Sequence, residues 1–214
     1  MEDAARTITK IELQRKNRNK ASIFLDGEYA FSLGVDIVSR HGLKAGETLP
    51  APRLALLQRE EERRQIKERA YRYLSYRAHS EKELQQKLER SGFGQEPIAE
   101  VLAELKANRL LNDDEFARSF ARSKLAKKPM GERRLRQELW KKGVDKEIID
   151  ATVSEIYADA DQLELARTLV ARTAPRYKHL EPQRRARRVR DLLLRQGFSW
   201  EIVRQVLEFD VDAE

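Results

Sequence analysis

Apolar residues recur with a helical period along most of this 214-residue chain. After a turn at Gly92, four apolar residues are spaced so that they form one stripe along a helix: Ile98, Val101, Leu102 and Leu105. Such a stripe is typical of a helix that packs against neighbouring helices. The pattern predicts a mainly α-helical fold for the chain beyond about residue 51.

The same helical pattern occurs three times, after intervals of 51 and 54 residues. Its three sets are Leu84, Leu88, Gly92, Phe93, Ile98, Leu102 and Leu105; Leu135, Leu139, Gly143, Val144, Ile149, Val153 and Ile156; and Val189, Leu193, Gly197, Phe198, Val203 and Leu207. The glycines are typical of helix ends, and Ser80 with Glu83 forms a capping-box pattern. A further helix precedes each set, at 66–76, 116–126 and 165–172. The sequence therefore predicts tandem three-helix repeats, stacked in an elongated and curved array.

The first fifty residues differ, because their apolar residues alternate with polar ones and are often β-branched. The dipeptide Asp26-Gly27 lies between two such runs and favours a two-residue hairpin turn. In that register Phe24 faces Tyr29 across the hairpin. A short helix at 35–40 is expected to follow. This segment is predicted to be small and β-rich.

The predicted organisation has five parts. Residues 1–50 form a small β-hairpin or meander extension and 51–65 a charged linker helix, followed by three-helix repeats at 66–108, 109–158 and 159–214. Within the linker helix, residues 58–65 include no apolar side chain, which predicts a solvent-exposed charged face.

The net charge of +7 is modest, but its distribution is uneven. Residues 121–145 hold nine basic and three acidic side chains, whereas 146–170 hold two basic and six acidic ones. Residues 171–200 are again basic, with nine against two. Cysteine is absent, and no long apolar segment suggests a membrane span or an export signal. We expect a cytoplasmic monomer with no membrane association.

Motifs for catalysis or metal binding are lacking in the sequence. It contains no Gly-rich phosphate loop, nucleophile elbow or thiol. The histidines His41, His79 and His179 are far apart in turn-like contexts, so we interpret them as surface residues. The acidic cluster at 113–115 precedes a helix and is interpreted as N-terminal capping. We therefore expect neither an enzyme nor a cofactor or metal site.

Basic residues recur at equivalent positions on the second helix of each repeat. Lys82, Arg133 and Arg187 are equivalent, as are Arg90, Lys141 and Arg195, while Arg134 matches Arg188 and Arg136 matches Arg190. Those of the second repeat lie roughly 60° or more from the apolar stripe, so they point outward. A solvated face is one interpretation. Because two segments are rich in such residues, we favour an anionic partner, either nucleic acid or an acidic protein surface, bound by these ten residues.

Two tryptophans accompany the basic residues. Trp140 lies among them and Trp200 opens the last helix. Either could anchor an interface or stack on a base. We favour a third interpretation, in which both pack between repeats.

Three stretches are similar to motifs of the RecX family. Residues 77–84, which read Arg-Ala-His-Ser-Glu-Lys-Glu-Leu, resemble its first motif together with Leu88 and Gly92. Residues 111–117 with Arg122, and 131–143, which read Gly-Glu-Arg-Arg-Leu-Arg-Gln-Glu-Leu-Trp-Lys-Lys-Gly, resemble its central motif. The resemblance covers about residues 66–210, and the first fifty residues correspond to an extension that some members have.

The resemblance implies tandem three-helix repeats without a cofactor. It also implies binding in the groove of the RecA recombinase filament on DNA, with inhibition of RecA in homologous recombination, DNA repair and the SOS response. The family motif supports Arg133, Arg134, Arg136 and Lys141 by position. Arg187, Arg188, Arg190 and Arg195 depend on the internal repeat alone.

Two other functions stay open. Gly92-Phe93-Gly94 between two short helices has the turn length of a helix-turn-helix DNA-binding protein. A helical scaffold that binds another acidic partner would also fit the charge pattern.

Overall fold

The computed structural model describes residues 5–158 and 160–211. Residues 1–4 of the predicted segment 1–50, and residues 159 and 212–214 of the predicted segment 159–214, lie outside the description. The elements are β1 (Arg6–Leu13), β2 (Lys20–Leu25), β3 (Glu28–Gly34), α1 (Val35–Arg40), β4 (Thr48–Leu49), α2 (Ala51–Tyr76), α3 (Glu81–Glu89), α4 (Gln95–Ala107), α5 (Asp113–Lys127), α6 (Glu132–Lys141), α7 (Lys146–Ala158), α8 (Gln162–Thr173), η1 (Ala174–Arg176), α9 (Pro182–Arg195) and α10 (Trp200–Val211). They confirm a mainly α fold with tandem three-helix repeats and a small N-terminal sheet. The chain divides into two compact units, one with residues up to 77 and 85–107, the other with 78–84 and those from 108 onward.

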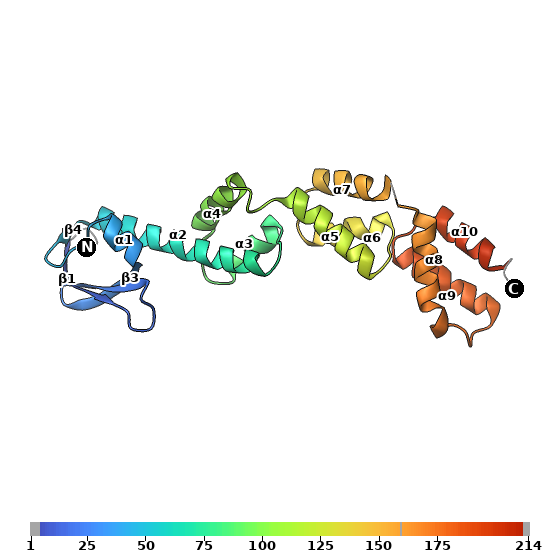
Figure 1. Ribbon diagram of the computed structural model, residues 1–214, viewed down its shortest axis with the longest axis horizontal. Coiled ribbons are helices and arrows are strands. Elements are labelled where there is room, and N and C mark those ends of the chain that lie inside the picture. The colour runs from blue at the N-terminus through green and yellow to red at the C-terminus, as the bar shows by residue number, and fades with distance from the viewer. Residues whose placement is uncertain (1–4, 159, 212–214) are drawn as a thin grey trace. The chain divides into compact units, whose positions relative to one another are not determined.

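The first unit begins with an antiparallel sheet of order β3-β2-β1-β4 (Figure 1). Phe24 pairs with Tyr29 across the β2–β3 hairpin, which confirms the predicted register. The short strand β4 pairs with β1 and was not predicted. One face of the sheet is covered by α1 and the start of α2, because Ile23, Leu33 and Ile37 share a buried cluster with Leu57 of α2.

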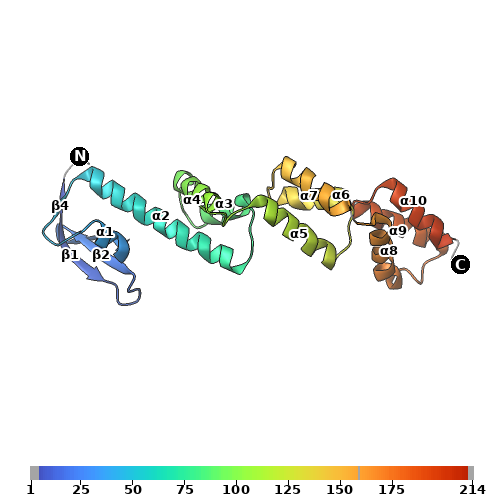
Figure 2. The ribbon, with the colours of Figure 1, turned by 45° about the horizontal axis from the view of Figure 1, so that its top comes forward.

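Helix α2 continues without a break through the predicted linker and the first helix of the first repeat (Figure 2). The expectation of a wholly exposed charged face at 58–65 is wrong for Glu61, whose exposed fraction is 4%. Its carboxylate accepts a hydrogen bond from the backbone N–H of Gly34 at 2.7 Å and pairs with Arg64 and Lys20. Burial raises the pKa of Glu61, but the hydrogen bonds from Arg64, Gln65 and Gly34 outweigh it and hold the pKa below its usual value. This charged residue therefore ties α2 to the sheet.

The second unit contains two three-helix groups, α5–α7 and α8–α10 (Figures 1 and 2). The predicted stripes are buried in them, since Leu135 and Leu139 of α6 and Leu193 of α9 have no exposed surface. In the first group the hydroxyl of Tyr157 donates to the carbonyl of Met130 at 2.7 Å, and burial raises the pKa of this tyrosine. Each group thus has its own apolar core, as the repeat predicts.

Predicted boundaries of the second helices are also confirmed. The Ser80 hydroxyl accepts a hydrogen bond from the backbone N–H of Glu83 at 3.2 Å. The glycines Gly92, Gly143 and Gly197 all have positive φ angles and lie two or three residues after the end of a second helix. The second helix of each repeat therefore has a defined start or end, which fixes where its basic side chains lie.

Candidate binding surface on the second helices

The second helices α6 and α9 bury one face and expose basic side chains on another. In α6 the apolar residues Leu135 and Leu139 face the core, and Arg133 and Lys141 are exposed. In α9 the same arrangement is made by Val189 and Leu193 on the buried face. This division follows from the helical period, because the basic positions lie off the apolar stripe.

The ten predicted binding residues differ in their exposure and in whether an acidic side chain lies beside them. Six are exposed and have no acidic partner among the described residues: Lys82, Arg90, Arg133, Arg187, Arg188 and Arg195. Three are partly buried and paired: Arg134 with Glu138 at 2.8 Å, Arg136 with Asp150, and Arg190 with Asp191 at 3.1 Å. Lys141 is exposed and lies 3.8 Å from Glu138. The unpaired cations are the stronger candidates, because a paired cation must lose its partner before it binds an anion.

Glu138 is the acidic residue that faces the basic side chains of α6. Its carboxylate bonds to Lys124 at 3.0 Å and also faces Arg134 and Lys141. The hydrogen bond from Lys124, with the charges of all three cations, holds the pKa of Glu138 below its usual range. This residue stays ionised and partly neutralises Arg134 and Lys141, which the spacing of basic residues alone could not reveal.

The end of α9 packs directly against the start of α6. The backbone N–H of Gly131 donates to the carbonyl of Gln196 at 2.9 Å. A Cβ placed on Gly197 would lie 2.3 Å from the backbone nitrogen of Arg134. This contact, which we call the α9–α6 joint, brings the last turn of α9 with Arg195 to the first turn of α6.

A matching contact joins the end of α6 to the start of α3, within the same unit. The Ser80 hydroxyl donates to the carbonyl of Lys142, and the Lys142 ammonium pairs with Glu83 at 2.5 Å. The side chain of Lys82 passes so close to Gly143 that a Cβ there would lie 2.2 Å from its Cδ. We call this contact the α6–α3 joint.

The two joints use equivalent positions of the repeat. Ser80 is 51 residues before Gly131, and Gly143 is 54 residues before Gly197, as in the sequence repeat. Each joint places the C-terminal cation of one second helix beside the N-terminal turn of the next. We call the exposed cations along these helices, Lys82, Arg133, Lys141, Arg187, Arg188 and Arg195, the basic row. Arg90 belongs to the other compact unit and is not part of the row.

The tryptophans do not pack between repeats, so that prediction is wrong. Trp140 has an exposed fraction of 73% and Trp200 of 57%. Leu194, at the position of α9 equivalent to Trp140, is 41% exposed. Large apolar side chains thus stand among the cations of both helices, where they can contribute to binding a partner.

The histidines and the acidic cluster at 113–115 lie in different surroundings. His79 is 3% exposed, so its interpretation as a surface residue is wrong, whereas His41 lies 3.0 Å from Glu60 and His179 is exposed. Asn112 caps α5, and the carboxylate of Asp113 accepts from the backbone N–H of Glu81 at the start of α3. Within residues 5–158 and 160–211, no group of three potential metal ligands was found.

Comparison with known proteins identifies the family of this chain. Its residues match the models "Regulatory protein RecX N-terminal domain" (6–49) and the first, second and third three-helix domains of RecX (67–105, 112–153 and 159–207). The N-terminal match extends the similarity beyond residues 66–210. No helix among the described residues is long and apolar enough to span a bilayer.

Similar proteins cover most of the chain. Regulatory protein RecX of Bacillus velezensis is 33% identical over 201 residues, which span 94% of this chain and 76% of the relative, and that of Bacillus licheniformis is 31% identical with the same coverage. A crystal structure of regulatory protein RecX aligns with a TM-score of 0.73 at 27% identity, over 95% of this chain and 99% of that one. RecX from Lactobacillus salivarius aligns with a TM-score of 0.63 at 27% identity, over 72% and 99%. The chain therefore belongs to the RecX family of regulatory proteins.

Proposed function

We propose that this protein inhibits the RecA recombinase by binding the RecA filament on DNA through its basic row. The carrying observation is the arrangement of the row, in which exposed cations recur on second helices that are joined end to end, and all of them except Lys141 lack an acidic partner among the described residues. A partner with negative charges at regular intervals is electrostatically complementary to a surface with positive charges at regular intervals. The protein acts in the cytoplasm as a monomer, without catalysis and without a cofactor.

The direct test is to titrate the protein into RecA on single-stranded DNA and follow ATP hydrolysis at several salt concentrations. Reversing the charges of Arg133 and Lys141 to Glu should raise the half-inhibitory concentration by roughly tenfold or more, because interfacial charge pairs contribute several kcal/mol. The matched control is the same reversal at Arg72 of α2 and Lys146 of α7, which are exposed and lack acidic partners among the described residues. That control should change the half-inhibitory concentration less than about twofold.

An equal effect of the two double variants would refute the placement of the binding surface on the row. A chain that binds neither RecA nor DNA would refute the proposal as a whole and favour a scaffold for another acidic partner. Increasing salt should weaken inhibition by the original chain, since counterion release and screening both act on the cations of the row.

Recognition of duplex DNA by a helix-turn-helix fits this structure less well. The helix after the turn, which would enter the major groove, is α4, α7 or α10 in the three repeats. Each has more acidic than basic side chains: α4 reads QEPIAEVLAELKA, α7 KEIIDATVSEIYA and α10 WEIVRQVLEFDV. Phosphates on both sides of the groove would be repelled by such helices. Protection of a symmetric operator sequence would nevertheless decide in favour of this function.

A further inference from the structure

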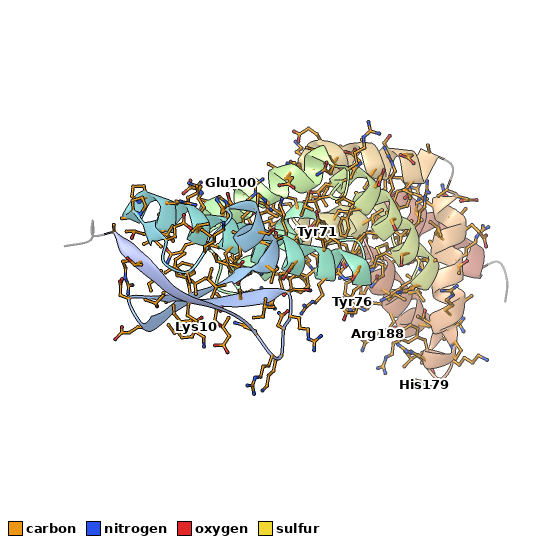
Figure 3. The ribbon with its side chains drawn as sticks, turned by 60° about the vertical axis from the view of Figure 1, so that its left-hand side comes forward. Lys10, Tyr71, Tyr76, Glu100, His179 and Arg188 are labelled. Carbon is orange, nitrogen blue, oxygen red and sulfur yellow. The ribbon has the colours of Figure 1, made fainter. Side chains whose placement is uncertain are left out.

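The N-terminal sheet has an exposed face that the proposed function leaves without a role. Its other face is filled by Ile8, Ile23, Leu25 and Leu33, which pack with α1 and α2. On the exposed face, the paired strands bring Lys10, Phe24 and Tyr29 side by side. Figure 3 shows Lys10 on the side of the sheet away from α1 and α2.

Two aromatic rings lie on this exposed face. The rings of Phe24 and Tyr29 are 6.0 Å apart with their planes at 78°, and the Lys10 ammonium is 5.5 Å from the Phe24 centroid. Lys10 thus covers Phe24, whereas Tyr29 is 59% exposed. The ring of Tyr29 is not needed to fill the core, because most of it is exposed. An exposed aromatic ring near basic side chains can stack on a nucleobase.

The loop between β1 and β2 supplies positive charge at one end of the same face. Arg15, Lys16 and Arg18 are all exposed. Lys16 and Arg18 have no acidic partner among the described residues, whereas the charge of Arg15 helps to lower the pKa of Glu12, after the larger effect of Lys10. The loop has a defined conformation, because the backbone N–H of Gln14 donates to the carbonyl of Lys20, and that of Lys20 donates to the carbonyl of Asn17, each at 2.9 Å. Little ordering is then needed when the three cations meet an anion.

Polar side chains connect the loop with the exposed ring. The Gln14 amide donates to the Ser32 hydroxyl at 2.8 Å, and that hydroxyl lies 3.1 Å from the hydroxyl of Tyr29. The ring of Tyr29 is therefore held by a hydrogen-bonded chain that begins at the base of the basic loop. The same groups offer donors and acceptors between the ring and the cations.

We propose that this face, with Tyr29 and the loop cations Arg15, Lys16 and Arg18, binds single-stranded nucleic acid without sequence specificity. Lys10 is left out of the site because its ammonium is paired with Glu12 at 2.8 Å. The phosphates lie against the loop and a base stacks on Tyr29. A single strand fits better than a duplex, because a duplex hides the faces of its bases. An acidic protein could use the same cations, and competition with polyglutamate in the test below distinguishes it from a single strand. The site is separate from the basic row and does not depend on the proposed effect on RecA.

The test is fluorescence anisotropy of a labelled thymidine oligomer of about 16 nucleotides, a length that a small β-sheet site can occupy. The whole chain is used with all six cations of the row replaced by Ala, so that the row does not bind the oligomer. RecA is absent, so failure here leaves the ATPase test of the proposed function unaffected.

In that background Tyr29→Ala should weaken binding roughly tenfold, the loss expected for one stacked base, and Tyr29→Phe should retain it. The matched control is Tyr71→Ala, which removes an aromatic ring of α2 that is 44% exposed; it should leave binding unchanged. Replacing Arg15, Lys16 and Arg18 by Ala should lower the slope of log Kd against log salt concentration by about 2, because each phosphate contact on a single strand contributes about 0.7.

Three results would overturn the proposal. The first is no binding of the oligomer by the background chain at low salt. The second is an equal loss with Tyr29→Ala and Tyr71→Ala. The third is displacement of the oligomer by polyglutamate as effectively as by unlabelled thymidine oligomer, which would indicate an acidic protein as the natural partner. Circular dichroism of every variant controls for unfolding of the sheet.

Discussion

Three glycine-to-alanine substitutions test the α9–α6 joint. They separate the cost of over-packing by an added Cβ from the cost of backbone strain at a positive φ angle. At Gly131 the φ angle is −85°, which any residue adopts, but a Cβ would lie 2.3 Å from the carbonyl oxygen of Gly197. Gly131→Ala therefore tests the contact alone, and over-packing of this kind costs about 1–3 kcal/mol. At Gly92 the φ angle is +89° and a Cβ would meet nothing within 4 Å. Gly92→Ala therefore tests backbone strain alone, about 1–2 kcal/mol.

Gly197 combines both costs, because its φ angle is +83° and its Cβ would lie 2.3 Å from the backbone nitrogen of Arg134. Neither backbone can move cheaply, so Gly197→Ala should destabilise the chain by about 2–5 kcal/mol, the sum of the two contributions. The measurement is urea denaturation together with amide hydrogen exchange, since a chain of several units need not unfold in one transition.

Exchange should accelerate in α8–α10 for both Gly131→Ala and Gly197→Ala, and should stay unchanged there for Gly92→Ala. A Gly131→Ala chain with original stability and original exchange in α9 would show that the joint is not formed as described. The row would then lose the contact that aligns its helices.

Three further predictions concern single side chains. Trp140→Ala should raise the half-inhibitory concentration against RecA roughly tenfold without lowering the melting temperature, because the side chain is 73% exposed; the control Tyr71→Ala should change neither. Glu138→Gln should lower the free energy of unfolding by about 1 kcal/mol, yet strengthen inhibition and its salt dependence, because the cations around it lose their carboxylate; weaker inhibition would contradict this. Glu61 has a lowered pKa in the folded chain, so its contribution to stability is present above its usual value of 4.5 and is lost as pH falls through the lowered pKa. Urea titrations between neutral and acid pH should therefore show a shallower acid loss of stability for Glu61→Gln, and equal slopes would refute its role.

Local sequence signals predicted the repeats and their boundaries. The apolar spacing around Leu135 and Leu139 identified a buried helix face, and Ser80 and the turn glycines marked helix ends, because capping and left-handed turns depend on residues close in sequence. The pairing of Phe24 with Tyr29 followed in the same way from the Asp-Gly turn.

The joints could not be predicted, because they depend on backbone approach between residues about 65 positions apart. Gly131 offers no signal in the sequence, because glycine is an ordinary residue before a helix. Only its φ angle of −85° in the structure shows that its conformation does not require glycine. The burial of Glu61 was also missed. That residue lies four positions after the buried Leu57 and so shares its helix face, but a run without apolar residues concealed this relation.

The exposure of Trp140 follows from the helical period. At 100° per residue it lies 100° from Leu139 and about 140° from Leu135, well away from the buried stripe. Packing of Trp140 between repeats is expected from the general preference of tryptophan for packed sites, but the helical angle outweighs that preference here. The pairing of Glu138 with three cations depends on side chains from two helices, so only the structure reveals it.

The central claim is that α6 faces the RecA filament with its basic side. The most direct measurement places a photo-crosslinking amino acid at Gln137, which is exposed between Arg133 and Lys141, and as a control at Glu147, which is exposed on α7. With RecA assembled on single-stranded DNA, position 137 should form crosslinks to RecA or DNA, and position 147 should form few. Crosslinks from position 147 with none from position 137 would contradict the account.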